Sequence, residues 1–186
     1  MPTSDFSNAR EIVEAIRTVR QARKYSSEPV SAEDLELLLQ VARWTGSARN
    51  TQPWHFIVID DKEQLRKISE LRAPINWVAD APLAIALVMD GKSPDSEIYD
   101  EGRVAERLLI TARILGLGGG VAWYGDEAQT AEGKRILGVP DELFNRGVVV
   151  IGHATSTKDT RPNANIGGRK PMSEITSHNR YGEPLA

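Results

Sequence analysis

The chain of 186 residues contains no cysteine, and this absence removes three kinds of chemistry. Without thiols the protein can form no disulfide, no thiolate nucleophile and no cysteine-ligated zinc site. The absence is compatible with a reducing compartment. The histidines are also few: His55, His153 and His178 are scattered without the spacing of metal ligands, so we expect no metal site.

Positive charge and long apolar runs are missing as well. Lys and Arg number 23 against 26 Asp and Glu, for a formal net charge of −3. Nucleic-acid binding normally shows as an excess of basic residues, so we expect no DNA or RNA partner. No apolar run approaches the roughly 20 residues of a membrane span, and the first residues lack a secretion-signal pattern. We therefore expect a cytoplasmic protein with no membrane partner.

Two glycine-containing stretches fall short of nucleotide-binding motifs. Gly91-Lys92-Ser93 follows an apolar run, but Ala86 stands where a phosphate loop needs its first glycine. The run Gly116–Gly120 lacks the GxGxxG spacing and follows a predicted helix, so we interpret it as a helix end. No Ser, His and Asp set can be assigned from spacing. We therefore expect no catalytic side chain and a bound cofactor that carries the chemistry.

Apolar periodicity and capping residues predict five helices and four strands in near alternation. The expected helices cover residues 9–20, 101–115 and 127–137, with a cap at Asn8 for the first and at Asp126 for the last, and two more begin after Ser31 and Asp61; the expected strands cover residues 56–59, 83–89, 121–124 and 148–151. The run Leu83–Met89 is apolar at nearly every position, which is typical of a strand buried on both faces. This order predicts one domain with a layered α/β or α+β sheet.

Three segments are predicted to be irregular. Residues 71–79 and 91–96 read as connections, and the second, rich in Gly, Ser and Pro, is a candidate mobile lid. The polar tail from Thr155 to Ala186 is either disordered or packed on another subunit. We favour packing, because the tail carries four spaced anchors: Ile166, Met172, Ile175 and Tyr181. The chain thus divides into a core of residues 1–154 and a C-terminal arm of residues 155–186.

Two polar stretches are candidates for ligand binding. The stretch Ser47–Trp54 joins a helix to an apolar strand and presents Asn50 and Gln52, whose amides suit the edge of a heteroaromatic ring. Both could equally be ordinary loop amides. The basic run Arg20–Lys24 is either a solvated helix end or a phosphate clamp, and Arg169-Lys170 forms a second basic pair.

Four segments together resemble the FMN-dependent nitroreductase family. They are RQARKY, EPVSAEDLELLLQVARWTGSARNTQPWHFIVI, LGLGGGVAW and GRKPMSEI, in this order along nearly the whole chain. NTQPWHF after a helix is the most specific piece. The resemblance implies a three-layer α+β fold with a central mixed sheet flanked by helices. It also implies a homodimer whose C-terminal arms cross to the partner, with one FMN at each of two sites between subunits.

The resemblance also implies a role for individual positions. It places Arg20, Gln21 and Arg23 at the FMN phosphate, ribityl chain and pyrimidine edge, Ser47, Asn50 and Gln52 at the same cofactor from the partner subunit, the backbone of Val121, Ala122 and Trp123 at flavin N5 and O4, and Arg169 and Lys170 at the phosphate. The chain departs from the family pattern at Val19 and Ala48, where the family often has an arginine and a serine.

The leading hypothesis is therefore an FMN-dependent NAD(P)H oxidoreductase. It would reduce an electron-poor acceptor, such as a nitroaromatic, a quinone or an activated alkene, by ping-pong hydride transfer through flavin N5. NADH or NADPH would be the reductant. We expect the variable walls of the pocket at residues 71–79 and 90–103, with Trp123 and Tyr124. The alternatives are a flavin-dependent reductive dehalogenase or flavin-consuming enzyme of the same fold, and a non-catalytic dimeric flavin-binding protein.

Overall fold

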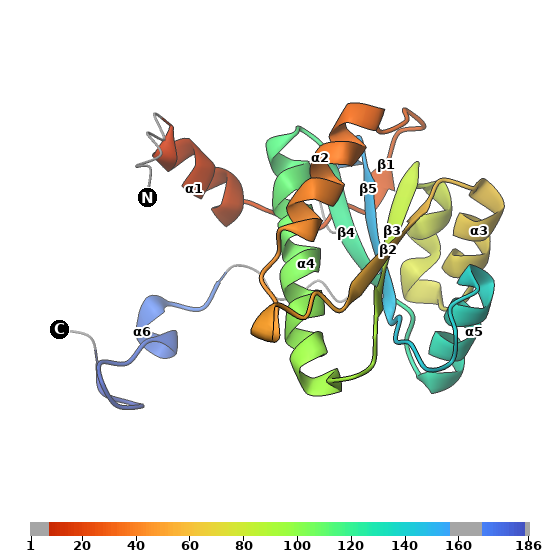
Figure 1. Ribbon diagram of the computed structural model, residues 1–186. Helices are drawn as coiled ribbons and strands as arrows, with labels where there is room; N and C mark the ends of the chain where they lie inside the picture. The colour runs from red at the N-terminus through yellow and green to blue at the C-terminus, as the bar shows by residue number, and fades with distance from the viewer. Residues whose placement is uncertain (1–7, 157–168, 185–186) are drawn as a thin grey trace.

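The computed structural model describes residues 8–156 and 169–184 and builds them into three layers (Figure 1). In chain order the elements are α1 (Ala9–Arg17), β1 (Lys24–Tyr25), α2 (Ala32–Arg43), the 3-10 helix η1 (Ala48–Asn50), β2 (Trp54–Ile59), α3 (Lys62–Glu70), the 3-10 helix η2 (Ala73–Asp80), β3 (Leu83–Met89), α4 (Pro94–Ile114), β4 (Gly118–Trp123), α5 (Glu127–Leu137), β5 (Gly147–Gly152), β6 (Ala154–Ser156) and α6 (Met172–Ile175). The predicted anchor Ile166 lies outside the described residues.

The central sheet has the strand order β2-β3-β5-β4, and each neighbouring pair is antiparallel. Its mixed character comes from a parallel bridge between Gln21 and Gly119 at the outer edge of β4. The Ala22 N–H donates to the Gly119 carbonyl at 2.8 Å in the same place. A separate pair, β1 with β6, was not predicted, and β6 runs across the expected boundary after residue 154.

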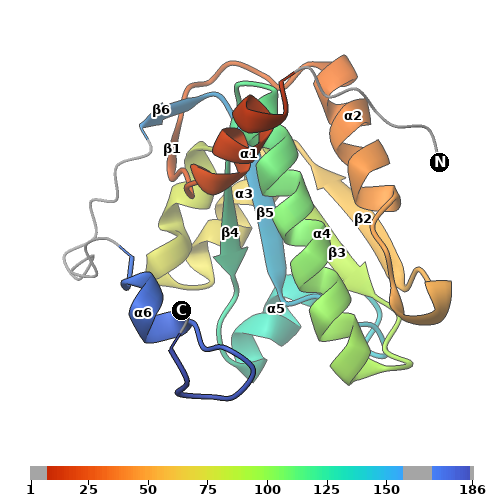
Figure 2. The same cartoon turned by 90° about the vertical axis from the view of Figure 1, so that its left-hand side faces the viewer.

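The sheet buries both of its faces, and β3 is buried along its whole length as predicted. On one face Ala84, Ala86 and Val150 pack towards α3, η2 and α5. On the other, Ile85 and Val149 pack towards α2 and α4, which Figure 2 shows crossing in front of the sheet. Successive strand residues point to opposite faces, so each strand supplies both cores. The α+β, three-layer fold is confirmed.

Most of the helix starts follow the predicted caps. The side chains of Ser31, Asp61 and Asp126 each accept the backbone N–H three residues later, at 3.0, 2.8 and 2.9 Å. The cap predicted at Asn8 is wrong, because its side chain makes no capping hydrogen bond.

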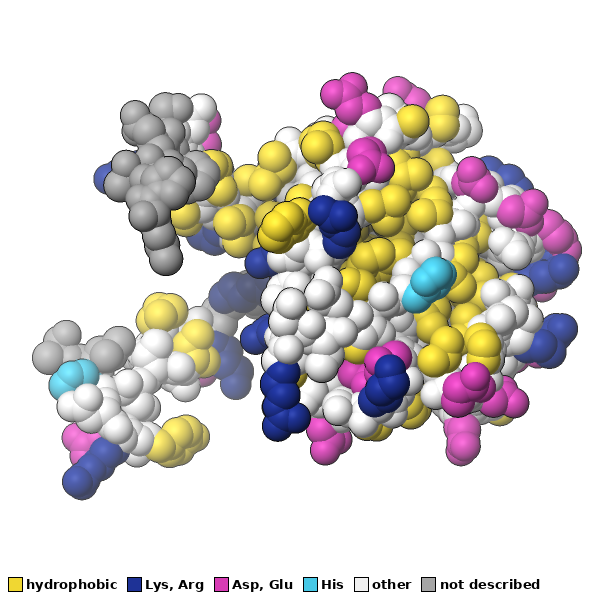
Figure 3. All heavy atoms as spheres, in the orientation of Figure 1, with side chains coloured by type: hydrophobic (Ala, Val, Ile, Leu, Met, Phe, Trp, Pro, Cys, Tyr) yellow, Lys and Arg dark blue, Asp and Glu magenta, His cyan; other side chains and the backbone are white. Residues whose placement is uncertain are grey.

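Helix α1 is shorter than predicted and carries an exposed apolar side. It ends at Arg17 rather than Arg20, and none of its residues is buried. Ile12, Val13 and Ile16 are 36%, 62% and 44% exposed. Figure 1 shows α1 projecting beyond the three layers, and Figure 3 shows hydrophobic side chains gathered on it. An amphipathic helix normally buries such a stripe.

Helix α4 is longer than predicted and replaces the expected lid. It begins at Pro94, because proline suits the first helical position, where its missing N–H costs nothing. The Glu97 carboxylate accepts the backbone N–H groups of Gly91 (3.0 Å) and Ser93 (2.7 Å), which fixes the preceding turn. Likewise, residues 76–78 are not irregular but lie in η2.

The glycine run has two roles rather than one. Gly116, with φ +76°, ends α4 as predicted, but Gly118 already starts β4. A Cβ on Gly118 would lie 2.5 Å from the Ala154 Cβ, and one on Gly120 would lie 2.6 Å from the Ala22 carbonyl oxygen. These strand glycines are needed because residues 22 and 154 press directly against β4.

Over the residues that it describes, the structure contains no helix both long and apolar enough to cross a membrane.

Candidate functional site

The outer edge of β4 is the first part of the candidate site. Hydrogen bonding alternates along an antiparallel strand, and Gly119 directs its backbone outward, to Ala22. Val121 and Trp123 therefore direct their backbone groups the same way, away from β5. Ala122 lies between them, so it directs its backbone groups towards β5 and buries its side chain in the core, and this outer edge is formed by its two neighbours.

A cavity of about 330 Å³ opens beside this edge, between β4, β5 and α4. It brings together three of the predicted residues, Gln21, Val121 and Trp123. Trp123 is 47% exposed and forms part of the wall. Tyr124 does not form part of the wall, because its ring is fully buried and packs against Gly133 of α5. The expectation that Tyr124 lines the pocket is wrong.

Glu101 lines the same cavity and was not singled out from the sequence. Its carboxylate forms an ion pair with Arg146 at 2.7 Å. Burial raises the pKa of Glu101, although the Arg146 guanidinium works in the opposite direction. The available signal was its position in register with the inward residues Val104 and Leu108 of α4, which places a carboxylate on a buried helix face.

The basic run lies next to this cavity, and its cations differ in what they contact. Arg17, which ends α1 just before the run, is held by Glu14 at 2.6 Å. Arg20 donates to the carbonyls of Val19 (2.8 Å) and Arg17 (3.4 Å), neutral groups that do not cancel its charge. The Arg23 guanidinium carbon lies 5.9 Å from the ring centroid of Trp77.

The second part of the site is the loop of residues 44–53, which presents Asn50 and Gln52 to solvent. Arg49, Asn50 and Gln52 have φ values of 52°, 55° and 49°. This left-handed region costs residues such as Arg and Gln about 1–2 kcal/mol, whereas Asn adopts it more readily. Ser47 accepts the Gln52 N–H on its hydroxyl at 2.9 Å and so closes the loop. A cavity of about 380 Å³ lies against Trp44, Asn50 and Gln52.

These two parts lie at opposite edges of the sheet. The loop leads into β2, and the basic run lies along the outer edge of β4. Strands β3 and β5 lie between these two edges. Three strand spacings amount to roughly 14 Å, and the two cavities share no lining residue. One chain thus brings together the residues within each group but not the two groups.

Arg169 and Lys170 form a third group, just before α6. Both are exposed, and Figures 1 and 2 show α6 set apart from the sheet and its covering helices. Their own chain does not bring them to either cavity. Among the described residues, no group of three or more His, Asp or Glu side chains could hold a metal ion.

Residues 16–92 match the model of the nitroreductase family. A relative from Archaeoglobus fulgidus, provisionally named an NADH dehydrogenase/NAD(P)H nitroreductase, is 35% identical over 156 residues, 80% of this chain and 88% of its own. An FMN reductase [NAD(P)H] of Bacillus subtilis is 25% identical over 92% of this chain and 74% of its own.

A solved structure, the FMN-dependent nitroreductase of Clostridium difficile R20291, superimposes with a TM-score of 0.78 at 25% identity. The match covers 91% of this chain and 99% of that one. Similarity therefore extends through both cavity-forming edges of the sheet.

Proposed function

Because this chain belongs to the nitroreductase family, we propose that it is an FMN-dependent NAD(P)H oxidoreductase that works as a homodimer, with one FMN at each of two sites between subunits. The observation that carries the two-chain site is the separation of the two residue groups at opposite sheet edges. In a dimer, the β4 edge of one chain can face the 44–53 loop of its partner.

The residues present fit FMN at both of its ends. Arg20, Arg169 and Lys170 supply cations for the phosphate, since cationic side chains match phosphate oxygens, and Arg23 is left for the pyrimidine edge. The outward backbone of Val121 and Trp123, with the amides of the partner's loop, offers donors and acceptors to the flavin ring edge. When bound, FMN supplies the hydride and electron transfer that the side chains lack.

The protein's own contribution is orientation and electrostatics. The apolar wall of the first cavity, which includes Leu109, Val121 and Val149, would exclude water from the side of a flavin ring that lay against it. An arginine near the pyrimidine edge favours negative charge there, which stabilises a reduced ring. Trp123 lines the cavity and is half exposed, so its ring would be available to stack on the reductant and on the acceptor in turn.

The dimer proposal also explains the uncovered apolar surface of the single chain. The apolar stripe on α1 is exposed. Strand β2 is an edge strand, and hydrophobic side chains are exposed at the surface between β2 and α2 (Figure 3). We assign these surfaces to the partner chain and its C-terminal arm. The acceptor is an electron-poor small molecule, and the need for NAD(P)H favours a cytoplasmic location.

Anaerobic spectroscopy tests the proposal. Purified protein saturated with FMN should retain the flavin through gel filtration at the mass of a dimer, bleach on addition of NADH or NADPH, and recover its colour with a nitroaromatic or a quinone. Recovery only with a halogenated aromatic would replace this acceptor class by the dehalogenase alternative. Bound flavin that never bleaches would leave a flavin-binding protein, and failure to bind FMN would overturn the proposal.

A further inference from the structure

Three polar side chains of α4 hold the backbone of the loop that carries Asn50 and Gln52. We name Asp100, Arg103 and Arg107 the α4 clamp. Arg107 donates to the Trp44 carbonyl at 2.9 Å, and Arg103 donates to the Gly46 carbonyl at 3.2 Å. Asp100 accepts the Ala48 N–H on one carboxylate oxygen at 3.2 Å.

The residues of the α4 clamp and the loop residues that they bind are both regularly spaced. Residues 100, 103 and 107 lie on one face of α4, because helical neighbours three and four positions apart share a face. They bind every second residue of the loop, at positions 48, 46 and 44. The loop is thereby fixed along its length just before the three positive-φ residues.

Asp100 is the central member. Its side chain is 2% exposed, and its second carboxylate oxygen accepts from Arg103 at 3.2 Å. One buried carboxylate thus binds the loop directly and also orients the arginine that binds it next. Charge-assisted bonds of this kind are stronger than neutral ones.

We propose that Asp100 is a positioning residue for the ring end of FMN, an inference that rests on the proposed function. It holds the strained loop in the conformation that aims Asn50 and Gln52 at the flavin ring bound by the partner chain. The phosphate end of FMN does not depend on it, because the cations assigned to the phosphate lie in other segments.

The experiment measures the dissociation constants of the full-length protein for FMN and for riboflavin, which lacks the phosphate, by flavin fluorescence. Asp100→Asn keeps the size of the side chain but turns an amide N–H or a neutral oxygen towards Arg103. We expect about tenfold weaker binding of both flavins and an altered visible absorption band of the bound flavin. Arg20→Ala, in contrast, should weaken FMN and spare riboflavin.

Glu97→Gln is the matched control. Glu97 is an equally buried acid of α4, at 2% exposure, but it binds the turn at Gly91 and Ser93. It should lower the stability of the protein without changing flavin affinity. Arg103→Met, at a 60% exposed side chain, provides a clamp variant that does not depend on a buried substitution and should weaken both flavins in parallel.

The outcomes separate the two proposals. Wild-type protein that binds neither flavin overturns the proposed function and this inference with it. The positioning role alone is overturned if the wild type binds flavin but Asp100→Asn and Arg103→Met bind it as tightly as Glu97→Gln does. A loss confined to FMN also overturns it, because the clamp would then act on the phosphate end.

Discussion

Arg49 has φ 52° and ψ 22°, a left-handed conformation that disfavours a side chain. Arg49→Gly removes about 1–2 kcal/mol of that strain and adds about 0.4–1 kcal/mol of unfolded-state entropy. We therefore expect the free energy of unfolding to rise by about 0.5 kcal/mol. Urea denaturation measures it. Arg43→Gly, the same change in the last turn of α2, should lower the free energy of unfolding by about 1 kcal/mol. A change of the same sign in both variants would contradict the strain at Arg49.

Arg20 and Arg17 stand three residues apart, and only Arg17 has its charge cancelled by a carboxylate in the contacts described above. If Arg20 serves the FMN phosphate, Arg20→Ala should weaken FMN binding by about tenfold or more, as expected for a charge-assisted bond. Arg17→Ala makes the same change in charge and should leave the affinity within about twofold. Isothermal titration with FMN compares the two affinities. Equal losses of affinity would support the alternative in which the basic run is a solvated helix end.

At the scale of elements, the glycines of β4 give a sharper test than the glycines of helices. Gly120→Ala would bring a Cβ to 2.6 Å from the backbone oxygen of Ala22, which cannot move like a flexible side chain. We expect a loss of about 1–3 kcal/mol of stability. Gly102→Ala, in α4 with nothing within 4 Å of the new Cβ, should gain about 1 kcal/mol. Thermal unfolding without ligand measures both.

Local patterns predicted the elements whose signals lie within a few residues. Asp126 and Gly138 bracket α5, and the unbroken apolar run Leu83–Met89 is β3 to the residue. The errors occur where distant contacts decide. Nothing near Gly118 in the sequence shows that residues 22 and 154 press on it, and Pro94 carries the same local signal whether it ends a loop or begins a helix.

The candidate site divides in the same way. The loop at Asn50 and Gln52 could be chosen from sequence, because a polar loop between a helix and an apolar strand is a local feature, whereas Val121 is a candidate only through the family resemblance. Asp100 could not be chosen, since a carboxylate in a helix is usually solvated, and only the packing of α4 shows that it is buried. For Glu101 the spacing to Val104 and Leu108 indicates an inward position, but only the structure shows the pairing with Arg146. The burial of both carboxylates depends on the sheet and on a loop some fifty residues away.

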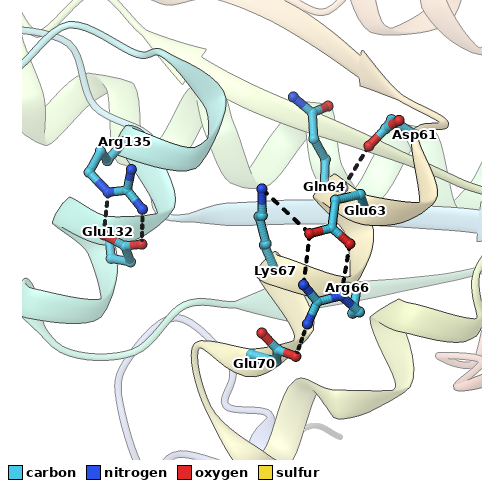
Figure 4. A network of polar contacts seen from close by, with 8 residues as sticks. All are labelled: Asp61, Glu63, Gln64, Arg66, Lys67, Glu70, Glu132 and Arg135. Atoms are coloured by element: carbon cyan, nitrogen blue, oxygen red, sulfur yellow. Dashed lines mark hydrogen bonds and ion pairs between the residues drawn. The ribbon is translucent and has the colours of Figure 1, made fainter.

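The exposed face of α3 carries a charge network that makes stability depend on pH (Figure 4). Arg66 donates to Glu63 at 2.7 Å and also pairs with Glu70, and Lys67 lies 3.5 Å from Glu63. Hydrogen bonds from Arg66 lower the pKa of Glu63 from its ordinary 4.5 to about 2. The folded state thus binds this proton less tightly than the unfolded chain, so the stabilisation is present at neutral pH and is lost as the pH falls from about 4.5 to 2.

Glu63→Gln should therefore be less stable than wild type at pH 7 and equal to it near pH 2. An NMR titration of the Glu63 carboxyl carbon measures the lowered pKa directly, and Arg66→Met should return it towards 4.5. The pair is exposed, so about 1 M salt should also reduce the difference in stability. A titration of Glu63 that is unchanged in Arg66→Met would show that the network does not cause the shift.

At the scale of the whole molecule, the proposed two-chain site would make cofactor binding depend on association. The sheet separates the β4 edge from the 44–53 loop, and α1 leaves Val13 62% exposed on a projecting helix. If α1 covers the partner, Val13→Glu places a charge in an apolar contact and should weaken the dimer by about tenfold or more. Arg10→Gln changes the net charge equally on the same helix and should leave the dimer intact.

Light scattering and FMN fluorescence, measured on the same dilution series, then decide whether the site needs two chains. Each half-site alone offers only part of the contacts, so flavin release should follow dimer dissociation in Val13→Glu at every protein concentration, and added FMN should restore the dimer by mass action. Monomers of Val13→Glu that bind FMN as tightly as the wild type would mean that one chain completes the site, and the loop at Asn50 and Gln52 would then need another ligand.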